Sequence, residues 1–130
     1  MIRIYQGVDI VELAKFRQIA ARNHRFVTDI FTEQERIYCQ SMKDPYLHFA
    51  GRFAAKESYL KALGTGLSGS GVDHMFQEIE VAATASGRPE ITVSGWTEKI
   101  AKRKKIRQTS VSISHAAHYA VATVILVGNG

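Results

Sequence analysis

The chain has 130 residues, with 17 Lys and Arg against 12 Asp and Glu, a formal net charge of +5 that favours anionic partners. Hydrophobic residues make up 45% and charged residues 22%, which is typical of a globular protein and argues against disorder. No run of about 18 apolar residues is present, and the first residues lack the apolar stretch of a signal peptide. We therefore expect one cytoplasmic domain over residues 1–130, with no membrane span. The single cysteine, Cys39, excludes an internal disulfide.

The first third of the chain predicts one strand and two helices. Apolar residues alternate over residues 2–10, as in a strand, and recur at helical spacing over residues 11–21. Thr32 and Glu35 form a capping-box pattern, in which the first side chain caps a helix and the second reaches back. We therefore expect a helix that begins near Glu33.

The longest predicted helix covers residues 48–63. It follows a break at Asp44–Pro45 and ends at Gly64, because glycine readily adopts the left-handed conformation found at helix C-termini. Residues 64–71 are rich in glycine and serine, and we expect them to form a flexible loop.

The second half of the chain is dominated by alternating patterns. Four segments are predicted as strands, and they are residues 79–81, 91–93, 111–113 and 119–127. The first two form a hairpin, the last two are joined by a tight turn, and the last is apolar on both faces, which favours a central place in its sheet. A basic helix is predicted over residues 96–107. Because helices come early and strands late, we expect an α+β fold.

Lys56 falls inside the apolar stripe of the long helix, between Phe49 and Leu63. An unpaired ammonium group is costly to bury. The side chain therefore extends to water, pairs with a structural carboxylate or binds a ligand anion, and the sequence leaves these alternatives open.

Four charged side chains are candidates for chemistry. Asp9 lies at the end of the first strand, where the ordinary interpretation is a turn residue or a helix N-cap. Glu57 and Lys61 share one helix edge, where the ordinary interpretation is a pair worth about 0.3–0.5 kcal/mol. The functional interpretation makes Asp9 and Glu57 ligands of one Mg²⁺ ion, while Lys61 and Arg52 neutralise substrate phosphate.

The segment from Gly64 to Gly69 matches the pattern G-x-G-x-x-G, yet it follows a predicted helix. The dinucleotide-binding fingerprint needs a preceding strand, and no Walker motif is present, so both of these interpretations fail. The segment is either a flexible connection or a loop whose backbone amides approach a phosphate.

His115 and His118 lie three residues apart in the last predicted turn. A zinc site would need cysteine or acidic partners, and none is near in the sequence. The ordinary interpretation is a pair of surface hydrogen-bonding groups, and the functional one is a contact of His115 with a phosphate or nucleotide.

The basic run from Lys99 to Arg107 is typical of a solvated helix face. It lacks the interleaved aromatic residues of a nucleic-acid stacking platform.

Three segments occur in a fixed order along the chain. They are residues 7–13, residues 49–66, and residues 112–115 followed by 119–122, the last preceded by a turn at residues 87–89. Together they resemble the holo-acyl-carrier-protein synthase family, the small 4′-phosphopantetheinyl transferases. The resemblance covers residues 5–127 and implies the mainly antiparallel fold of that family, with helices packed on the sheet.

The resemblance implies a Mg²⁺-dependent transfer of 4′-phosphopantetheine from coenzyme A to a serine of apo-acyl carrier protein, with release of 3′,5′-ADP, in fatty acid biosynthesis. Asp9 and Glu57 match the metal-binding carboxylates, and Lys61 matches the lysine at the reacting phosphate. These three are the predicted catalytic residues. The general base is either Glu57 or a metal-bound water oriented by Asp9.

Further residues match the family's binding positions. Those matched to the coenzyme A site are Arg52, Lys61, Gly64, Thr65, Gly66, Pro89 and His115. Those matched to the acidic acceptor are Lys15, Arg22 and Arg25 on the first helix, although Lys15 stands where many relatives have Arg and cannot make a bidentate contact. The family's homotrimers have sites at subunit boundaries, which implies that His115 serves the Asp9–Glu57 pair of a neighbouring subunit.

Two other function classes fit parts of the sequence. A small basic nucleic-acid-binding module would use the run from Lys99 to Arg107 and would bind with a steep salt dependence. A catalytically silent interaction protein would dock acidic partners, but it has no physical need for Asp9, Glu57 and Lys61. We therefore expect an enzyme whose partners are coenzyme A and an acyl carrier protein, and neither a membrane nor nucleic acid.

Overall fold

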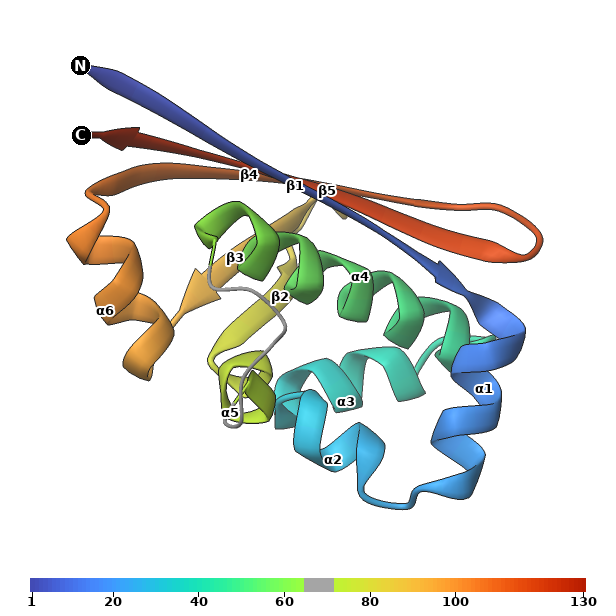
Figure 1. Ribbon diagram of the computed structural model, residues 1–130. Helices are drawn as coiled ribbons and strands as arrows, with labels where there is room; N and C mark the ends of the chain where they lie inside the picture. Colours follow the sequence, from blue (N-terminus) through green and yellow to red (C-terminus); the bar gives the residue numbers. More distant parts are fainter. Residues whose placement is uncertain (65–71) are drawn as a thin grey trace.

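A three-stranded antiparallel sheet forms one layer of the molecule (Figure 1). The computed structural model describes residues 1–64 and 72–130. Strand β1 (Ile2–Glu12) pairs with β5 (Tyr119–Asn129), and β5 pairs on its other side with β4 (Ile106–His115). The central position predicted for the last strand is confirmed.

Helix α4 (Pro45–Leu63) lies against one face of this sheet (Figure 1). It begins three residues earlier than predicted because Pro45 occupies a first-turn position, where its missing N–H and fixed φ are well tolerated. It ends at Gly64, whose φ of 76° is left-handed, as predicted.

Three short helices pack beneath α4 (Figure 1). They are α1 (Leu13–Arg22), α2 (Phe26–Ile30) and α3 (Glu33–Gln40). The capping box of α3 is confirmed: the Thr32 side chain accepts from the Glu35 N–H, and the Glu35 carboxylate accepts from the Thr32 N–H. The prediction missed α2, because five residues are too few to show helical periodicity.

The rest of the chain forms a hairpin and two helices beside the main sheet. The hairpin joins β2 (Ile79–Ala83) to β3 (Pro89–Val93), as predicted, and α5 (Val72–Gln77) precedes it. Helix α6 (Gly95–Arg103) follows. The expected loop at residues 65–71 lies outside the described residues.

The predicted extent of the basic helix is wrong at its C-terminal end. Helix α6 stops at Arg103, and Lys105 adopts a left-handed φ of 58° that redirects the chain. Arg107 therefore belongs to β4, where its backbone lies in a strand paired with β5. Pairing with a strand that is distant in the sequence overrides the local helical pattern here.

Lys56 pairs with a structural carboxylate, one of the three alternatives that the sequence left open. Its ammonium group is fully buried, lies 2.7 Å from Glu35 Oε1, and donates to the carbonyl oxygens of Phe76 and Ile79. Glu35 also accepts from the backbone N–H of Val81 at 2.7 Å. A buried charge is tolerable only with such partners, so this network fixes α3, α4 and β2 against one another.

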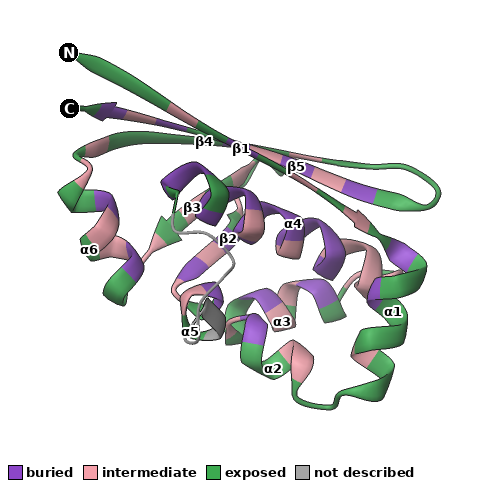
Figure 2. Ribbon diagram, in the orientation of Figure 1, coloured by how far each residue is buried: buried purple, intermediate pink, exposed green. Residues whose placement is uncertain are grey.

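Strand β1 is largely exposed (Figure 2), and apolar side chains lie on its face that points away from α4. Ile4, Val8 and Ile10 on β1 have exposed fractions of 69%, 54% and 64%, and Ile125 on β5 is also exposed. They point away from α4 because side chains alternate across a strand. In the described parts of the chain, no helix is long and apolar enough to cross a bilayer.

Candidate active site

Strand β1 approaches α4 most closely at Gly7. A Cβ atom at this position would overlap the carbonyl oxygen of Ser58 and lie 2.9 Å from the backbone nitrogen of Ala62. Only glycine fits such a backbone-to-backbone contact. Asp9 follows two residues later and points to the same face of the sheet, so Gly7 brings this carboxylate close to the helix.

Asp9 and Lys61 form an ion pair between the strand and the helix. The Lys61 ammonium lies 2.9 Å from Asp9 Oδ1 and donates to the carbonyl oxygen of Val8 at 3.1 Å. The Asp9 side chain is 12% exposed and that of Lys61 is 41% exposed, so the pair lies at the edge of the core with its cation open to water. The cation is therefore accessible to an incoming anion.

Glu57 joins this pair from one turn earlier on α4. Burial, the charge of Asp9 and a hydrogen bond between the two carboxyl groups together raise the pKa of Glu57 to about 7, while Lys61 opposes the shift. Two adjacent carboxylates that repel each other in this way would both be stabilised by a divalent cation.

The two carboxyl groups fit the requirements of Mg²⁺. This ion typically takes one or two protein carboxylates and completes its shell with water and substrate phosphates. In the described ranges of the chain, no group of three or more His, Cys, Asp or Glu side chains could hold a metal ion. Asp9 and Glu57 are two adjacent carboxyl groups that could hold such an ion together with water and substrate phosphates.

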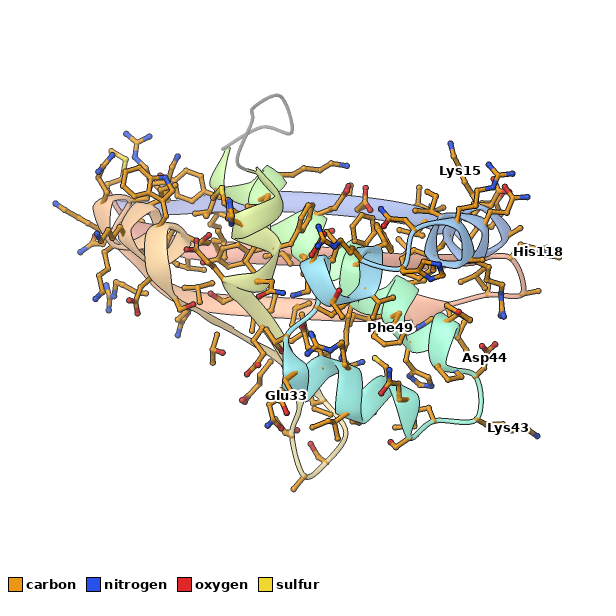
Figure 3. The ribbon with its side chains drawn as sticks, turned by 90° about the horizontal axis from the view of Figure 1, so that it is seen from below. Lys15, Glu33, Lys43, Asp44, Phe49 and His118 are labelled. Atoms are coloured by element: carbon orange, nitrogen blue, oxygen red, sulfur yellow. The ribbon has the colours of Figure 1, made fainter. Side chains whose placement is uncertain are left out.

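A cavity of about 220 Å³ opens beside the carboxylates, between β1, α1 and α4. Asp9, Glu57 and Lys15 contribute polar groups to its wall. Its apolar lining includes Phe16, Ile19, Phe26 and Phe53. Lys15 projects from α1 at the end of the molecule that also carries His118 (Figure 3). A basic helix thus borders the acidic pair.

Arg22 and Arg25, the other two cations predicted to contact the acceptor, are exposed. Arg22 is the last residue of α1, and Arg25 precedes α2.

Arg52 and His115 lie away from the carboxylate pair. Arg52 is buried, its Nε donates to the carbonyl oxygen of Val81 at 3.3 Å, and its guanidinium carbon lies 4.1 Å from the centre of the Tyr38 ring. The His115 imidazole packs over Gly51, where its Nε2 lies 2.8 Å from the position that a Cβ atom would take. Arg52 on α4 and His115 on β4 therefore both lie beside the N-terminal half of α4.

Helix geometry separates His115 from Glu57 within one chain. His115 packs against His48, with ring centroids 5.9 Å apart. Glu57 follows His48 by nine residues, which is about 13 Å along the helix and about half a turn around it. The two predicted ends of the site therefore lie on opposite sides of α4.

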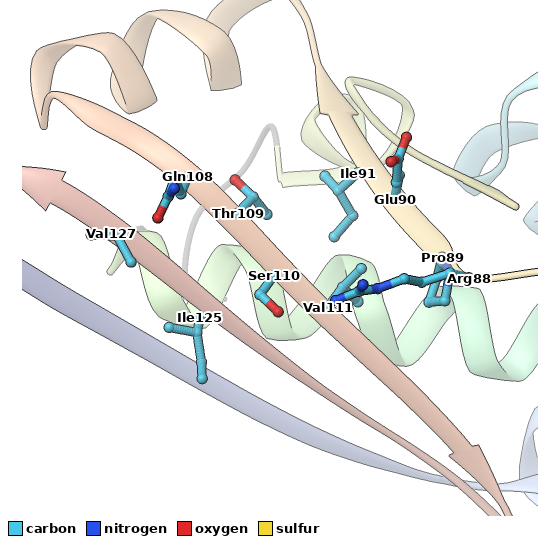
Figure 4. Close-up of a pocket in the computed structure, with 10 residues that line it drawn as sticks. All are labelled: Arg88, Pro89, Glu90, Ile91, Gln108, Thr109, Ser110, Val111, Ile125 and Val127. Carbon is cyan, nitrogen blue, oxygen red and sulfur yellow. The ribbon is translucent and has the colours of Figure 1, made fainter. Parts of the chain in front are cut away.

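The remaining predicted residues are placed as follows. Pro89 lines a cavity of about 560 Å³ between β3 and β4, together with Arg88 and Thr109 (Figure 4). Gly64 caps α4, while Thr65 and Gly66 lie outside the described residues. The structure thus brings together Asp9, Glu57, Lys61 and Lys15, and keeps Arg52, Pro89 and His115 apart from them.

Sequence reasoning missed His48, which lies between Tyr38 and His115. In the sequence, His48 is marked only by its position one helical turn before Gly51 and Arg52. That position indicates little until the fold shows which residues pack beside it.

The sequence and the fold match one group of known proteins. The sequence profile of the 4′-phosphopantetheinyl transferase superfamily matches residues 6–124. A holo-[acyl-carrier-protein] synthase from Caldanaerobacter subterraneus is 39% identical over 127 residues, which span 98% of this chain and 97% of that protein.

Two solved structures extend the match. An ACPS–CoA complex from Chronobacterium ammoniagenes has a TM-score of 0.86 at 28% identity and covers 98% of this chain and 99% of its own. A holo-(acyl-carrier-protein) synthase from Bacillus anthracis in complex with CoA (3′,5′-ADP) has a TM-score of 0.78 at 32% identity. The match covers 99% of this chain and 100% of that chain.

The chain belongs to the 4′-phosphopantetheinyl transferase superfamily. Within it, the chain groups with the holo-[acyl-carrier-protein] synthases, so it is an enzyme of the phosphopantetheinyl transferase class. The resemblance found in the sequence, the α+β fold class and the expectation of an enzyme are all confirmed.

Proposed function

We propose that this enzyme transfers 4′-phosphopantetheine from coenzyme A to a serine hydroxyl of an apo-acyl carrier protein, with Mg²⁺ held by Asp9 and Glu57. The observation that carries the proposal is the meeting of Asp9, on the first strand, with Glu57 and Lys61 on α4. Relatives named holo-[acyl-carrier-protein] synthase, and related structures that contain coenzyme A, support the same substrates for this chain.

The reaction exchanges one phosphorus–oxygen bond for another. The serine Oγ attacks the phosphorus that carries pantetheine, and the bond from that phosphorus to the bridging oxygen breaks, so that 3′,5′-ADP leaves with the bridging oxygen. When bound, Mg²⁺ neutralises charge on the pyrophosphate. Lys61, which Asp9 and the Val8 carbonyl already hold, adds a second positive charge. The serine proton passes to Glu57 or to a water that Asp9 orients.

We propose that the enzyme is a homotrimer with active sites at subunit boundaries. Coenzyme A bound at Asp9 and Glu57 of one subunit would place its nucleotide end against His115, Arg52 and Pro89 of the next. The separation of these groups around α4 within one chain supports this arrangement. So does the exposed apolar face of β1, because association removes apolar surface from water.

We propose that the carrier protein docks on α1 and the start of α2. Lys15 lines the same cavity as Asp9 and Glu57, and Arg22 and Arg25 extend the basic surface away from it. An acidic carrier held there would have its serine close to the carboxylates, and electrostatic attraction would speed the encounter. We place this activity in fatty acid biosynthesis in the cytoplasm, with residues 1–130 acting as one domain.

Intact-mass spectrometry tests the proposal. Apo-acyl carrier protein incubated with the enzyme, coenzyme A and Mg²⁺ should gain the mass of one phosphopantetheinyl group, and excess chelator should prevent the gain. The matched variant Glu57→Gln should slow transfer by about 100-fold or more while keeping the wild-type circular dichroism spectrum. An unmodified carrier with the wild-type enzyme would overturn the proposal, and full activity of the variant would remove Glu57 from the site.

A further inference from the structure

A cluster of two imidazoles and a guanidinium lies on the N-terminal half of α4, away from the carboxylate pair. His48 is half-buried between His115, at 5.9 Å between ring centroids, and Tyr38, at 6.1 Å. Arg52, one turn further along the helix, lies over the same Tyr38 ring. Arg52 and His48 thus contact one Tyr38 ring, and His115 packs on the other side of His48, so that three groups that carry or can gain a positive charge form one cluster.

The helix is shaped to admit His115 into this cluster. A side chain at Gly51 would collide with the His115 imidazole and with the side chain of Ile113. Glycine in the interior of a helix costs about 1 kcal/mol relative to alanine. That cost is offset here by the close packing of His115, which places its ring within reach of His48.

The groups that face His48 decide its charge. They are Arg52 on its own helix, Asp44 immediately before that helix, His115 from β4 and Tyr38 from α3. Burial lowers the pKa of His48, the nearby His115 and Arg52 lower it further, and Asp44 opposes them. His48 is therefore neutral at neutral pH. An anion bound beside His115 and Arg52 would cancel their positive field and favour the protonated imidazole.

We propose that His48 is an additional phosphate-binding residue at the nucleotide end of coenzyme A, and that it takes up a proton from solvent when the 3′-phosphate binds beside His115. This inference rests on the proposed function, in which coenzyme A is the substrate. In the proposed trimer the reacting pyrophosphate belongs with the carboxylate pair of the neighbouring subunit, away from this cluster. The 3′-phosphate is the remaining anionic group, and it is a phosphomonoester that carries up to two negative charges.

Isothermal titration calorimetry of coenzyme A tests this in two buffers of different ionisation enthalpy. At pH 7.5 the phosphomonoester, whose second pKa is about 6, is already a dianion, so proton uptake reports on the protein. The wild type should take up a fraction of one proton per coenzyme A. His48→Phe should abolish most of this uptake and weaken binding about tenfold at pH 6.5. The matched control His118→Gln, in the nearby turn, should behave as the wild type.

Two further measurements keep the inference separate from the proposed function. Dephospho-coenzyme A, which lacks the 3′-phosphate, should bind to the wild type with little proton uptake. The NMR titration of His48 in the unmodified protein should move to higher pH when coenzyme A is added. Three results would each overturn the inference: unchanged proton uptake in His48→Phe, equal proton uptake with dephospho-coenzyme A, or an NMR titration of His48 that does not move. The proposed function would stand in each case if the carrier protein is still modified. Failure of coenzyme A to bind at all would instead overturn the proposed function.

Discussion

Asp9 on β1 and Lys61 on α4 lie 52 positions apart in the sequence and form an ion pair of 2.9 Å. The pair closes the gap between the sheet and the helix just beyond Gly7, the point of closest backbone approach. With Glu57 beside them, two negative groups and one positive group share a small, partly buried volume.

Glu57 should make the metal-free protein less stable as the pH rises. The pKa of Glu57 is 4.5 in the unfolded chain and about 7 in the folded protein. Between these two pH values the native state therefore binds more protons than the unfolded state. Stability contributed by this group is present below about 4.5 and is lost as the pH rises towards 7. Glu57→Gln should remove that loss, so in chelator its melting temperature should exceed that of the wild type at pH 8 but not at pH 4.5. Differential scanning calorimetry measures this, and a variant that melts lower than the wild type at pH 8 would contradict it.

Gly7→Ala should disturb both stability and activity. The added methyl group would force β1 away from the backbone of α4, and overpacking of this kind costs about 1–3 kcal/mol. It would also move Asp9 away from Glu57, so transfer should slow even at temperatures where the variant is folded. Gly128→Ala is the matched control, because its Cβ would meet Lys104 O at 3.0 Å at the other end of the sheet. The control should lose stability without losing activity, and equal loss of activity in both would refute a specific role of Gly7.

Lys56→Met should be strongly destabilising. It would leave the Glu35 carboxylate buried without its cation, and breaking a buried pair in this way costs about 3–5 kcal/mol. Adding Glu35→Gln removes the unpaired charge, although the amide has a single acceptor oxygen and can serve the N–H of only one of Thr32 and Val81. The double variant should therefore be more stable than Lys56→Met in urea unfolding. A double variant less stable than the single one would show that the charge of Glu35 is not the cause.

Mixed subunits should restore activity if sites form at subunit boundaries. Glu57→Gln and His115→Ala are each expected to be inactive, because each lacks one end of the site. When they are refolded together in equal amounts, random assembly around a three-fold axis gives about a quarter of the boundaries a wild-type Glu57 and a wild-type His115. Transfer activity should recover to about that fraction. If sedimentation confirms a mixed trimer but activity does not recover, Glu57 and His115 do not meet at a subunit boundary, and the proposed arrangement of the site is wrong.

Local signals predicted those parts of the fold that local interactions determine. The capping box at Thr32 and Glu35 and the glycine stop at Gly64 hold as predicted, because each concerns neighbouring residues. The helix predicted over the basic run extends too far because Arg107 belongs to β4, at a register shift between Ile106 and Gln108, and that strand is held by β5, which is distant in the sequence. The partner of Lys56 stayed open because Glu35 lies on another helix.

The site was predicted in the same uneven way. Asp9, Glu57 and Lys61 were identified by the resemblance to a known family, and the fold then brought them together. No motif pointed to His48, since its relation to His115 exists only after β4 has packed on α4. The role of Gly7 likewise depends on the position of Ser58, a residue of a different element.

Calorimetric titration with coenzyme A in the presence and absence of Mg²⁺ tests the central claim most directly, namely that Asp9 and Glu57 hold one cation against the substrate pyrophosphate. For the wild type, Mg²⁺ should tighten coenzyme A binding by about tenfold or more, and Asp9→Asn and Glu57→Gln should each remove that gain. An affinity for coenzyme A that is indifferent to Mg²⁺ in the wild type, or a gain that survives in both variants, would contradict the account.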